Sequence, residues 1–282
     1  MYELSVENEF GEVLTLTNNP DYDVLEVQGL NPAPASINTV AVSGIDGTRF
    51  NSARIGERNI VIRLNIRPPI EDNRINLYKY FRVKHPVRVR YKNEHLDVYI
   101  DGYIDSFENG LFGMLQQPQI SIICPKPYWL SESGTEVYFD STTALFEFPF
   151  SIAAEGVAFS ELNAVTSTYF NAGNVATGAV ITFTALANGV QNPTFYNLTT
   201  GKYFGVGITM QSGDVITINT QQGEKSVTLL RAGVKTSIVN SRSEGSTWLI
   251  FEPGENEVSY GADEGQTSLR VSLTSVQKYE GV

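Results

Sequence analysis

The sequence has very little cysteine and histidine. Its 282 residues include one cysteine, Cys124, and two histidines. A single cysteine excludes a disulfide within the chain and any cysteine-cluster metal site, and two histidines are too few for the usual zinc sites. Basic residues are outnumbered, 20 Lys and Arg against 31 Asp and Glu, which gives a formal charge of -11. We therefore expect no specific binding of nucleic acid, because such binding over a whole surface requires a net basic face.

Long hydrophobic runs are also missing. No segment approaches the roughly 18 apolar residues of a membrane-spanning helix, and the N-terminal stretch "MYELSVENEFGEVLTL" has neither the basic nor the apolar region of a signal peptide. We expect a protein that is made in the cytosol, stays soluble and does not bind membranes. What the sequence does contain is abundant glycine, small polar residues and aromatics, which favour strands and turns over helices.

Alternating apolar residues predict strands in the first half of the chain. In "NIVIRLNIR" the apolar side chains at every second position would point inward, with Arg63 and Arg67 on the other face. In "PVRVRYK" the valines and the tyrosine would point inward, with Arg88 and Arg90 outward. Both segments have the period of two that is expected of half-buried strands.

One helix is predicted between these two strands. The segment "PPIEDNRINLYKYFRVKHP" is bracketed by prolines, Asp72 is a candidate N-cap, and Ile75, Tyr78 and Phe81 are spaced for one helical face.

Charge is distributed in two opposed blocks. Residues 1–48 contain eight acidic side chains and no Lys or Arg, whereas residues 49–92 contain twelve basic side chains and three acidic ones. Either solvated faces segregate by sign, or the two segments meet, within one chain or between subunits.

The second half of the chain has a different texture. Charged residues become sparse, and turn signals such as "ANGV", "TTGK", "QSGD" and "EPGEN" recur roughly every 8 to 14 residues between alternating runs. This spacing is typical of an antiparallel sandwich or jelly roll of about eight strands. We predict a mainly β protein of two domains, residues 1–145 and residues 146–282. Trp248 in "TWLIF" could stack on a sugar, but its alternation with Ile250 favours a core position.

Candidate catalytic residues are few. Neither His85 nor His95 stands in a recognisable catalytic context, since both lie at ordinary strand boundaries. Cys124 shares a strand face with Ile120 and Ile122, and burial there would raise the pKa of its thiol and make it a small hydrophobic residue. The acidic run "DGYIDSFENG" could suggest calcium, but its spacing does not match an EF-hand and a solvated hairpin accounts for it. We predict no catalytic, cofactor-binding or metal site.

Seven segments follow one another along the chain: "GIDGTRFNSARIGERNIVIRLNI", "VRVRYKNEHLDVYIDGYIDSFE", "ISIICPKPYWL", "NPTFYNLTTGKYFGV", "MQSGDVITINT", "LIFEPGENEVSY" and the closing "YEGV". In this order they resemble the distal tail protein (Dit) family of long, flexible-tailed bacteriophages and prophages. The set spans most of residues 40–282.

The resemblance implies an N-terminal ring-forming belt domain, a β structure with one helix, that assembles as a homo-hexamer, alone or in stacked rings. It also implies a C-terminal galectin-like β-sandwich. In the family the ring is the hub of the tail tip or baseplate, between the tail tube protein and the tail-associated tip protein, and in some phages it holds receptor-binding proteins. A protein of this kind is a non-enzymatic part of the virion tail, without cofactors, and is made in the host bacterial cytoplasm.

Five residues are candidates for interfaces. DNA passes through such a hub, and an open lumen lined with arginines would hold phosphates and hinder passage. We therefore expect Arg63, Arg67, Arg88 and Arg90 mostly to pair with acidic groups or to face a neighbouring subunit. We expect Trp129 to pack where the first domain passes the chain to the second. The closing "QKYEGV" can stay in the sandwich or return to the first domain.

Two other functions compete with the hub. A carbohydrate-binding protein would recognise host cell-surface glycans through exposed aromatics that line a groove on the C-terminal sandwich. A cell-wall hydrolase would need a cleft with two carboxylates at catalytic separation.

Overall fold

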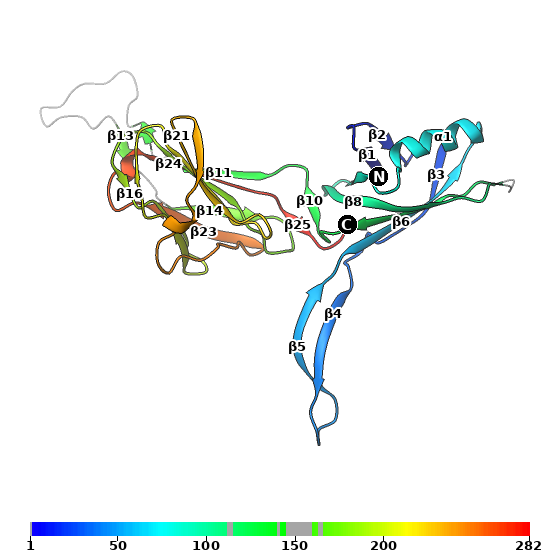
Figure 1. Cartoon of the computed structure of the whole chain (residues 1–282), viewed down its shortest axis with the longest axis horizontal. Helices are drawn as coiled ribbons and strands as arrows, with labels where there is room; N and C mark the ends of the chain where they lie inside the picture. The colour runs from blue at the N-terminus through cyan, green and yellow to red at the C-terminus, as the bar shows by residue number, and fades with distance from the viewer. Residues whose placement is uncertain (1, 112–114, 140–141, 145–159, 163–165) are drawn as a thin grey trace, which may run out of the picture. The chain divides into compact units, whose positions relative to one another are not determined.

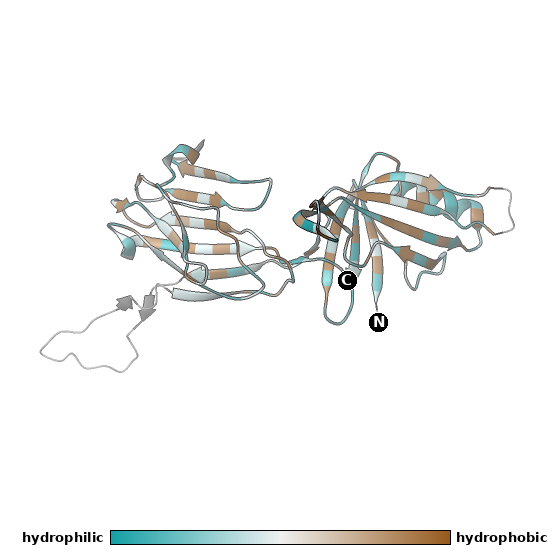
Figure 2. Ribbon diagram, turned by 90° about the horizontal axis from the view of Figure 1, so that it is seen from below, coloured by the Kyte–Doolittle hydropathy of each residue, from teal (hydrophilic) through white to brown (hydrophobic). Residues whose placement is uncertain are grey.

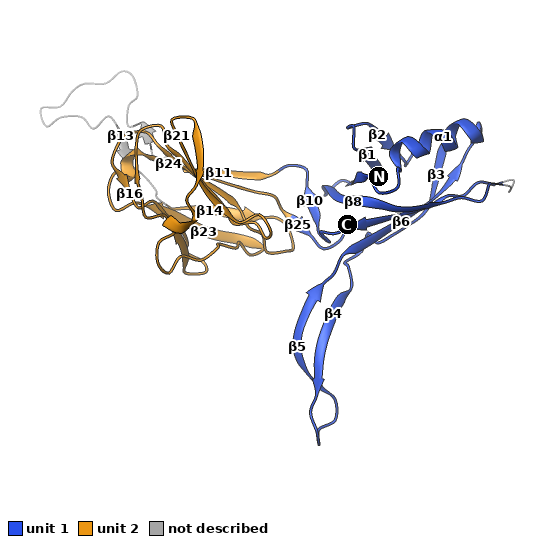
Figure 3. Ribbon diagram, in the orientation of Figure 1, with its two compact units in different colours: residues 1–133, 278–282 blue, residues 134–277 orange. Residues whose placement is uncertain are grey.

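The protein is mainly β and is built from two compact units. The structure, a computed structural model, describes residues 2–111, 115–139, 142–144, 160–162 and 166–282. Unit 1 comprises Met1–Ser133 with Lys278–Val282, and unit 2 comprises Gly134–Gln277 (Figure 3). The predicted mainly β class is confirmed, and the predicted boundary between residues 145 and 146 falls outside the described residues. None of the helices in the described ranges is long and apolar enough to span a membrane.

Unit 1 consists of one large antiparallel sheet, one helix and a separate two-stranded ribbon. The path through the sheet is β2-β1-β7-β8-β9-β6-β3, with β10 and β25 joined beside β8, and β4 pairs with β5 to form the ribbon. The elements are β1 (Glu3–Asn8), β2 (Val13–Thr15), β3 (Tyr22–Gln28), β4 (Ala35–Ala41), β5 (Thr48–Ile55), β6 (Arg58–Ile66), α1 (Ile70–Tyr80), β7 (Pro86–Lys92), β8 (Asp97–Glu108), β9 (Gln119–Cys124), β10 (Trp129–Ser131) and β25 (Lys278–Tyr279).

The alternation read from the sequence sets the inward faces of these strands. On β6, Ile60, Ile62 and Leu64 are fully buried, and on β7 Val87 and Val89 are buried as predicted. Figure 2 shows the same alternation as hydrophobic and hydrophilic bands along the strands. Each fully buried aliphatic side chain contributes about 1.5–3 kcal/mol to folding, so these faces account for the core of unit 1.

Helix α1 forms where it was predicted, but its buried face is a different one. Of the predicted face, Ile75 and Tyr78 are 54% and 41% exposed and only Phe81 is buried. Leu77, which was not predicted to face inward, is buried with it. The predicted cap was also wrong. The N-cap is Pro69, and Asp72 lies in the first turn. Its negative charge there interacts favourably with the positive end of the helix dipole. The face is decided by the sheet beneath it, because a short helix with mixed apolar positions offers two stripes of similar hydrophobicity.

The closing residues return to unit 1. In β25, Tyr279 pairs with Trp129 and Lys278 with Leu130, and β10 itself pairs with β8. The chain therefore passes between the units twice, before Gly134 and after Gln277.

Unit 2 is a β-sandwich. Its two larger sheets have the orders β11-β24-β15-β20-β21-β22 and β14-β23-β17-β18. The elements are β11 (Thr135–Phe139), β12 (Thr142–Ala144), β13 (Ser160–Leu162), β14 (Thr166–Asn171), β15 (Val180–Ala185), β16 (Val190–Gln191), β17 (Thr194–Asn197), β18 (Lys202–Gly205), β19 (Thr209–Met210), β20 (Val215–Asn219), β21 (Ser226–Arg231), β22 (Val234–Ser237), η1 (Val239–Ser241), β23 (Gly254–Gly261), η2 (Gln266–Ser268) and β24 (Leu269–Ser275).

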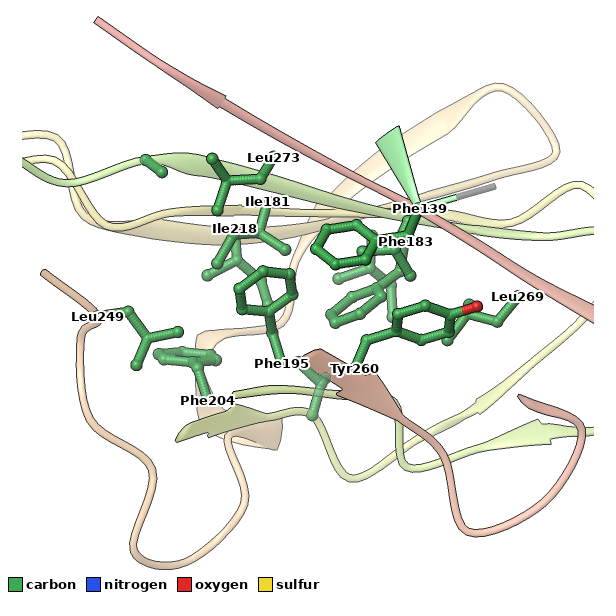
Figure 4. Packing of buried hydrophobic residues seen from close by; sticks show 14 of the residues in the cluster. Phe139, Ile181, Phe183, Phe195, Phe204, Ile218, Leu249, Tyr260, Leu269 and Leu273 are labelled. Carbon is green, nitrogen blue, oxygen red and sulfur yellow. The ribbon is translucent and has the colours of Figure 1, made fainter. Parts of the chain in front are cut away.

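The core of unit 2 lies between its two larger sheets. Figure 4 shows Phe183 and Leu273 of one sheet facing Phe195 and Tyr260 of the other, and all four are buried. Phe139 packs edge to face on both Phe195 and Tyr260, with ring centroids 5.6 and 5.5 Å apart. Interdigitation of this kind is what places the inner faces of two sheets about 10 Å apart.

One expected strand is absent from unit 2. The segment "STWLIF" forms no regular strand, and its inward positions are Leu249 and Phe251, with Ile250 exposed. Trp248 is half-buried against the core, 5.0 Å from the ring of Phe204. Trp248 is thus a packing residue, as predicted. The residue expected to point inward with it, Ile250, is exposed instead.

Candidate interaction surfaces

The β4–β5 ribbon, residues 35–55, is almost entirely exposed and is called the arm here. Every residue of β4 and of β5 is exposed except Ile55, which is half-buried. Figure 1 shows the arm standing away from the rest of unit 1. A two-stranded hairpin without a covered face is marginally stable in water, and its free edges invite pairing with another chain.

The local sequence explains why the arm is a hairpin. Two runs rich in small and β-branched residues flank a tip that contains Gly44 and Gly47, with φ of 82° and 95°. Positive φ is easy for glycine and strained for other residues, so these two positions fix the reversal. The strands pair in register from Ala35–Ile55 to Ala41–Thr48, with one irregularity after Asn38.

The register divides the arm into two faces of different character. Directly opposed residues share a face. One face is uncharged and includes Ile37 and Phe50, which are 65% and 63% exposed. We call it the uncharged face: Ala35, Ile37, Thr39, Ala41, Thr48, Phe50, Ala53 and Ile55. The other face carries Arg49 and Arg54, and among the described residues neither arginine has an ion-pair partner.

A second apolar surface of unit 1 is a hollow beside the edge strand β3. Its volume is about 310 Å³. It is lined by Tyr2, Leu4, Val24, Leu25, Glu26, Val27, Leu30 and Tyr91. The register between β3 and β6 is interrupted at Leu25, whose side chain is 48% exposed. Exposed apolar side chains that gather beside a hollow, unlike single ones, often mark interaction sites.

The four predicted arginines form two separate groups in the sheet. Arg63 pairs with Glu26 at 3.3 Å, and Arg67 forms a two-pronged pair with Asp23 at 2.5 and 2.9 Å. The hydrogen bonds raise the pKa of Arg67 and lower that of Asp23. Both pairs join β6 or the residue after it to β3.

Arg88 and Arg90 lie on β7, which is separated from β6 by the two strands β8 and β9. Arg88 pairs with Asp101 at 2.7 Å, and its guanidinium lies 4.0 Å from the ring centroid of Tyr99. Arg90 pairs with Glu7 at 2.5 Å and also with Glu132. All four arginines thus have carboxylate partners in their own chain, and whether any of them also meets another subunit stays a prediction.

The opposed charge blocks meet within the chain. Glu7, Asp23 and Glu26 of the acidic block are the partners of Arg90, Arg67 and Arg63, and Glu9 pairs with Arg82 and His85. Each such surface pair contributes little, about 0–1 kcal/mol. The two charge blocks therefore form ion pairs between neighbouring strands of one chain. Their opposite signs give no independent support for contacts between subunits.

Trp129 and Cys124 belong to the core of unit 1. Trp129 is fully buried, so its effect on assembly stays a prediction. Cys124 is also fully buried, as predicted, and desolvation raises the pKa of its thiol to about 12. A raised thiol pKa favours an unreactive side chain. A methyl group at Gly102 would lie 2.8 Å from its sulfur atom.

The arm was not predicted from the sequence as a structural element. Its signal was the pair of β-rich runs around "SGIDG", but alternation alone does not distinguish a covered strand from an exposed one. The exposed aromatics of unit 2 are divided between its two larger sheets. Tyr138 lies on β11 of one sheet, and Phe170 and Tyr196 lie on β14 and β17 of the other, where the ring centroid of Tyr196 is 6.0 Å from that of Tyr203. Within the described ranges, no group of three or more His, Cys, Asp or Glu is placed to hold a metal.

Two family models match the chain. Residues 11–122, in unit 1, match the phage tail protein RIFT-related domain, and residues 172–275, in unit 2, match the C-terminal domain of the siphovirus-type tail component. Together they cover most of the sequence. No curated protein sequence matches the chain.

Solved structures share the fold. The chain is similar to the Dit (gp 19.1) protein of phage SPP1, described as a paradigm of the hub adsorption apparatus of phages that infect Gram-positive hosts. The TM-score is 0.68 at 11% identity, with 98% of each chain covered. It is also similar to chains of the phage p2 baseplate in its activated conformation with calcium and with strontium. Their TM-scores are 0.53 and 0.52, both at 11% identity with both chains fully covered.

Proposed function

The chain belongs to the distal tail protein family of siphophage and prophage tails, and from this premise we propose that it forms the hexameric hub ring of a tail tip. The ring joins the tail tube to the tip or baseplate, without catalytic activity. Its partners are further copies of itself, the tail tube protein, the tail-associated tip protein and, through the sandwich, receptor-binding proteins. Its place is the virion tail.

The observation that carries this proposal is the exposed arm. The uncharged face of the arm places Ile37 and Phe50 in water. Covering one large apolar side chain contributes about 1.5–3 kcal/mol, so a partner surface would stabilise the arm substantially. A free hairpin of this composition is also an aggregation hazard in a monomer, and assembly removes that hazard.

A closed ring requires two different, complementary surfaces on each subunit. The arm supplies one of them. The hollow beside β3, about 310 Å³ in volume, is an apolar surface of the same unit that suits the second role. In the ring, the arm of one copy lies against the hollow of the next, and Arg49 and Arg54 remain on the outer side of the arm, available to the carboxylates that predominate in a chain of charge -11.

Imaging of arm variants tests the role of the arm. Phe50→Asp places a charge on the uncharged face, whereas Ser52→Asp places the same charge on the opposite face of the same strand. Negative-stain images should show six-membered rings for the wild type and for Ser52→Asp, and single particles for Phe50→Asp. Rings that survive Phe50→Asp at wild-type abundance would contradict the proposed contact.

A cross-link tests where the arm docks. In a Cys124→Ala background, cysteines at Phe50 and Leu25 should form a disulfide between copies when they are combined in one chain. A cysteine pair at Phe50 and Ile75, which is 54% exposed on α1, serves as the control. Efficient linkage of the control pair and none of the first would assign the arm to another surface.

A further inference from the structure

Arg58 is a charged residue in the inward phase of β6. It precedes Ile60 and Ile62 on the same face, and it is only 2% exposed. Within the described residues its guanidinium has no carboxylate partner, and burial lowers its pKa. A buried charge must be hydrogen-bonded to be tolerated, so the acceptors of Arg58 show what this residue holds together.

The acceptors are backbone carbonyls from three segments that lie far apart in sequence. Nη1 donates to Gly29 at 2.5 Å and to Asn31 at 2.6 Å, in the connector between β3 and β4. Nε donates to Pro127 at 2.7 Å, just before β10, and Nη2 donates to Glu280 in the closing segment. The planar fork of arginine can serve several acceptors at once, which a lysine ammonium at the same place cannot do with the same geometry.

The closing segment lies directly on the connector that leads into the arm. The amide of Val282 donates to the carbonyl of Leu30 at 3.1 Å. A methyl group at Gly281 would lie 2.8 Å from Cδ of Pro32, so the two backbones are in close contact. The connector also touches β6, because a methyl group at Gly29 would lie 2.1 Å from the carbonyl oxygen of Asn59. The connector, residues 29–34, is called the root of the arm here, and it contacts both β6 and residues 278–282.

We propose that Arg58 is a positioning residue for the arm, and that it fastens the arm's root, residues 29–34, to the closing segment, residues 278–282. The direction of the arm then depends on a segment that the chain reaches only after completing unit 2. A root held in one geometry lowers the entropy lost when the arm docks on a neighbouring copy. This inference rests on the proposed ring, in which the arm is the docking element.

Two variants of the full-length protein test the proposal, and each has a matched control. Arg58→Met removes the guanidinium but keeps a long apolar stem, and its control is Arg270→Met at an exposed position of unit 2. Gly281→Val forces the closing segment away from Pro32 while the Arg58 side chain itself is kept. Its control is Gly110→Val, where a methyl group would meet open space. The readouts are hydrogen exchange of the Val282 amide, which donates to the carbonyl of Leu30 in the root, exchange of the β6 and β15 amides, and the fraction of rings.

Both test variants should accelerate exchange of the Val282 amide by about tenfold or more, since a hydrogen bond from a charged donor has about that effect on a local opening equilibrium. Protection of β15 should be unchanged, and the fraction of rings should fall. Both controls should behave as the wild type. If Arg58→Met lowers protection throughout unit 1, its effect on the root is hidden by a general loss of stability. The Gly281→Val variant then decides whether the closing segment fastens the root.

Unchanged exchange of the Val282 amide in both variants overturns the proposal. Faster exchange there with an unaltered fraction of rings also overturns it, because the fastening would then have no role in assembly. A wild type that forms no rings contradicts the hub itself, whereas the exchange measurement, made on single chains, still reports whether Arg58 and the closing segment hold the root.

Discussion

Cys124 shows how burial sets the chemistry of a single side chain. It continues the inward face of Ile120 and Ile122 on β9, and all three are fully buried. The prolines that follow, Pro125 and Pro127, end the strand because they lack a backbone donor and fix φ. Cys124 is thus part of the packing of unit 1, as the sequence predicted.

We expect Cys124 to resist alkylation in the folded protein. Its thiol pKa of about 12 leaves almost no thiolate at pH 8, so iodoacetamide should label it only after denaturation, as mass spectrometry can measure. Cys124→Ala should lower the free energy of unfolding by about 1–2 kcal/mol and leave ring formation intact. Rapid labelling under native conditions would revive the reactive-thiol reading.

Asp214 is a buried charged side chain in unit 2, and its surroundings also set its chemistry. Its side chain is 2% exposed, accepts a hydrogen bond from the amide of Gln211 at 2.7 Å and pairs with Arg231 at 2.5 Å. These bonds tie the turn between β19 and β20 to β21. The hydrogen bond from Arg231 is the main cause of a lowered Asp214 pKa.

Asp214→Asn should destabilise unit 2 by about 1.5–3 kcal/mol at neutral pH, because a charge-assisted hydrogen-bond set is lost. A lowered folded pKa stabilises the fold fully above the ordinary Asp range and loses that effect as pH falls through the folded pKa. The gap between wild type and variant should therefore narrow from about pH 5 toward pH 2, measured by urea unfolding with exchange of the β15 amides. A gap independent of pH would contradict this account.

At the scale of elements, α1 shows that burial depends on the neighbouring sheet as well as on periodicity. Leu77 faces the sheet and is fully buried, whereas Ile75 faces solvent. The carbonyl of Asn73 accepts a hydrogen bond from the hydroxyl of Tyr22 at 2.9 Å, which fixes the rotation of the helix on β3.

Leu77→Ala should lower the stability of unit 1 by about 2–4 kcal/mol, and Ile75→Ala by less than about 0.5 kcal/mol. Trp129 is the fluorophore of unit 1 and Trp248 that of unit 2. Urea unfolding followed by fluorescence in a Trp248→Phe background therefore reports on unit 1. Equal effects of the two substitutions would mean that the helix packs by its other face.

The sequence predicted the elements better than their surroundings. The alternation in "NIVIRLNIR" located β6 and its buried isoleucines, because apolar residues at every second position indicate a strand with one covered face. The arm could not be predicted in this way, since an exposed hairpin and a buried one share the same local pattern. Arg58 gave a usable signal, a charge in the inward phase of β6, but its carbonyl partners come from distant segments that no local pattern relates.

At the scale of the whole molecule, the fold of unit 2 was easier to predict from the sequence than the contacts within unit 1. Unit 2 was predictable as a sandwich because regularly spaced turns between alternating runs leave few other folds. The pairing of the charge blocks within unit 1 was not predictable, because sign alone does not say whether partners lie in one chain or in two. The return of residues 278–282 to unit 1 was equally hidden, since two residues of strand carry no periodic signal.

The central claim is that this chain assembles into a ring through unit 1, and the mass of the purified wild type in solution tests it most directly. Light scattering over a wide range of concentrations should give a particle of six times the chain mass of 31.1 kDa, or of twelve times that mass if two rings stack. A particle of 31.1 kDa at every concentration would contradict the account.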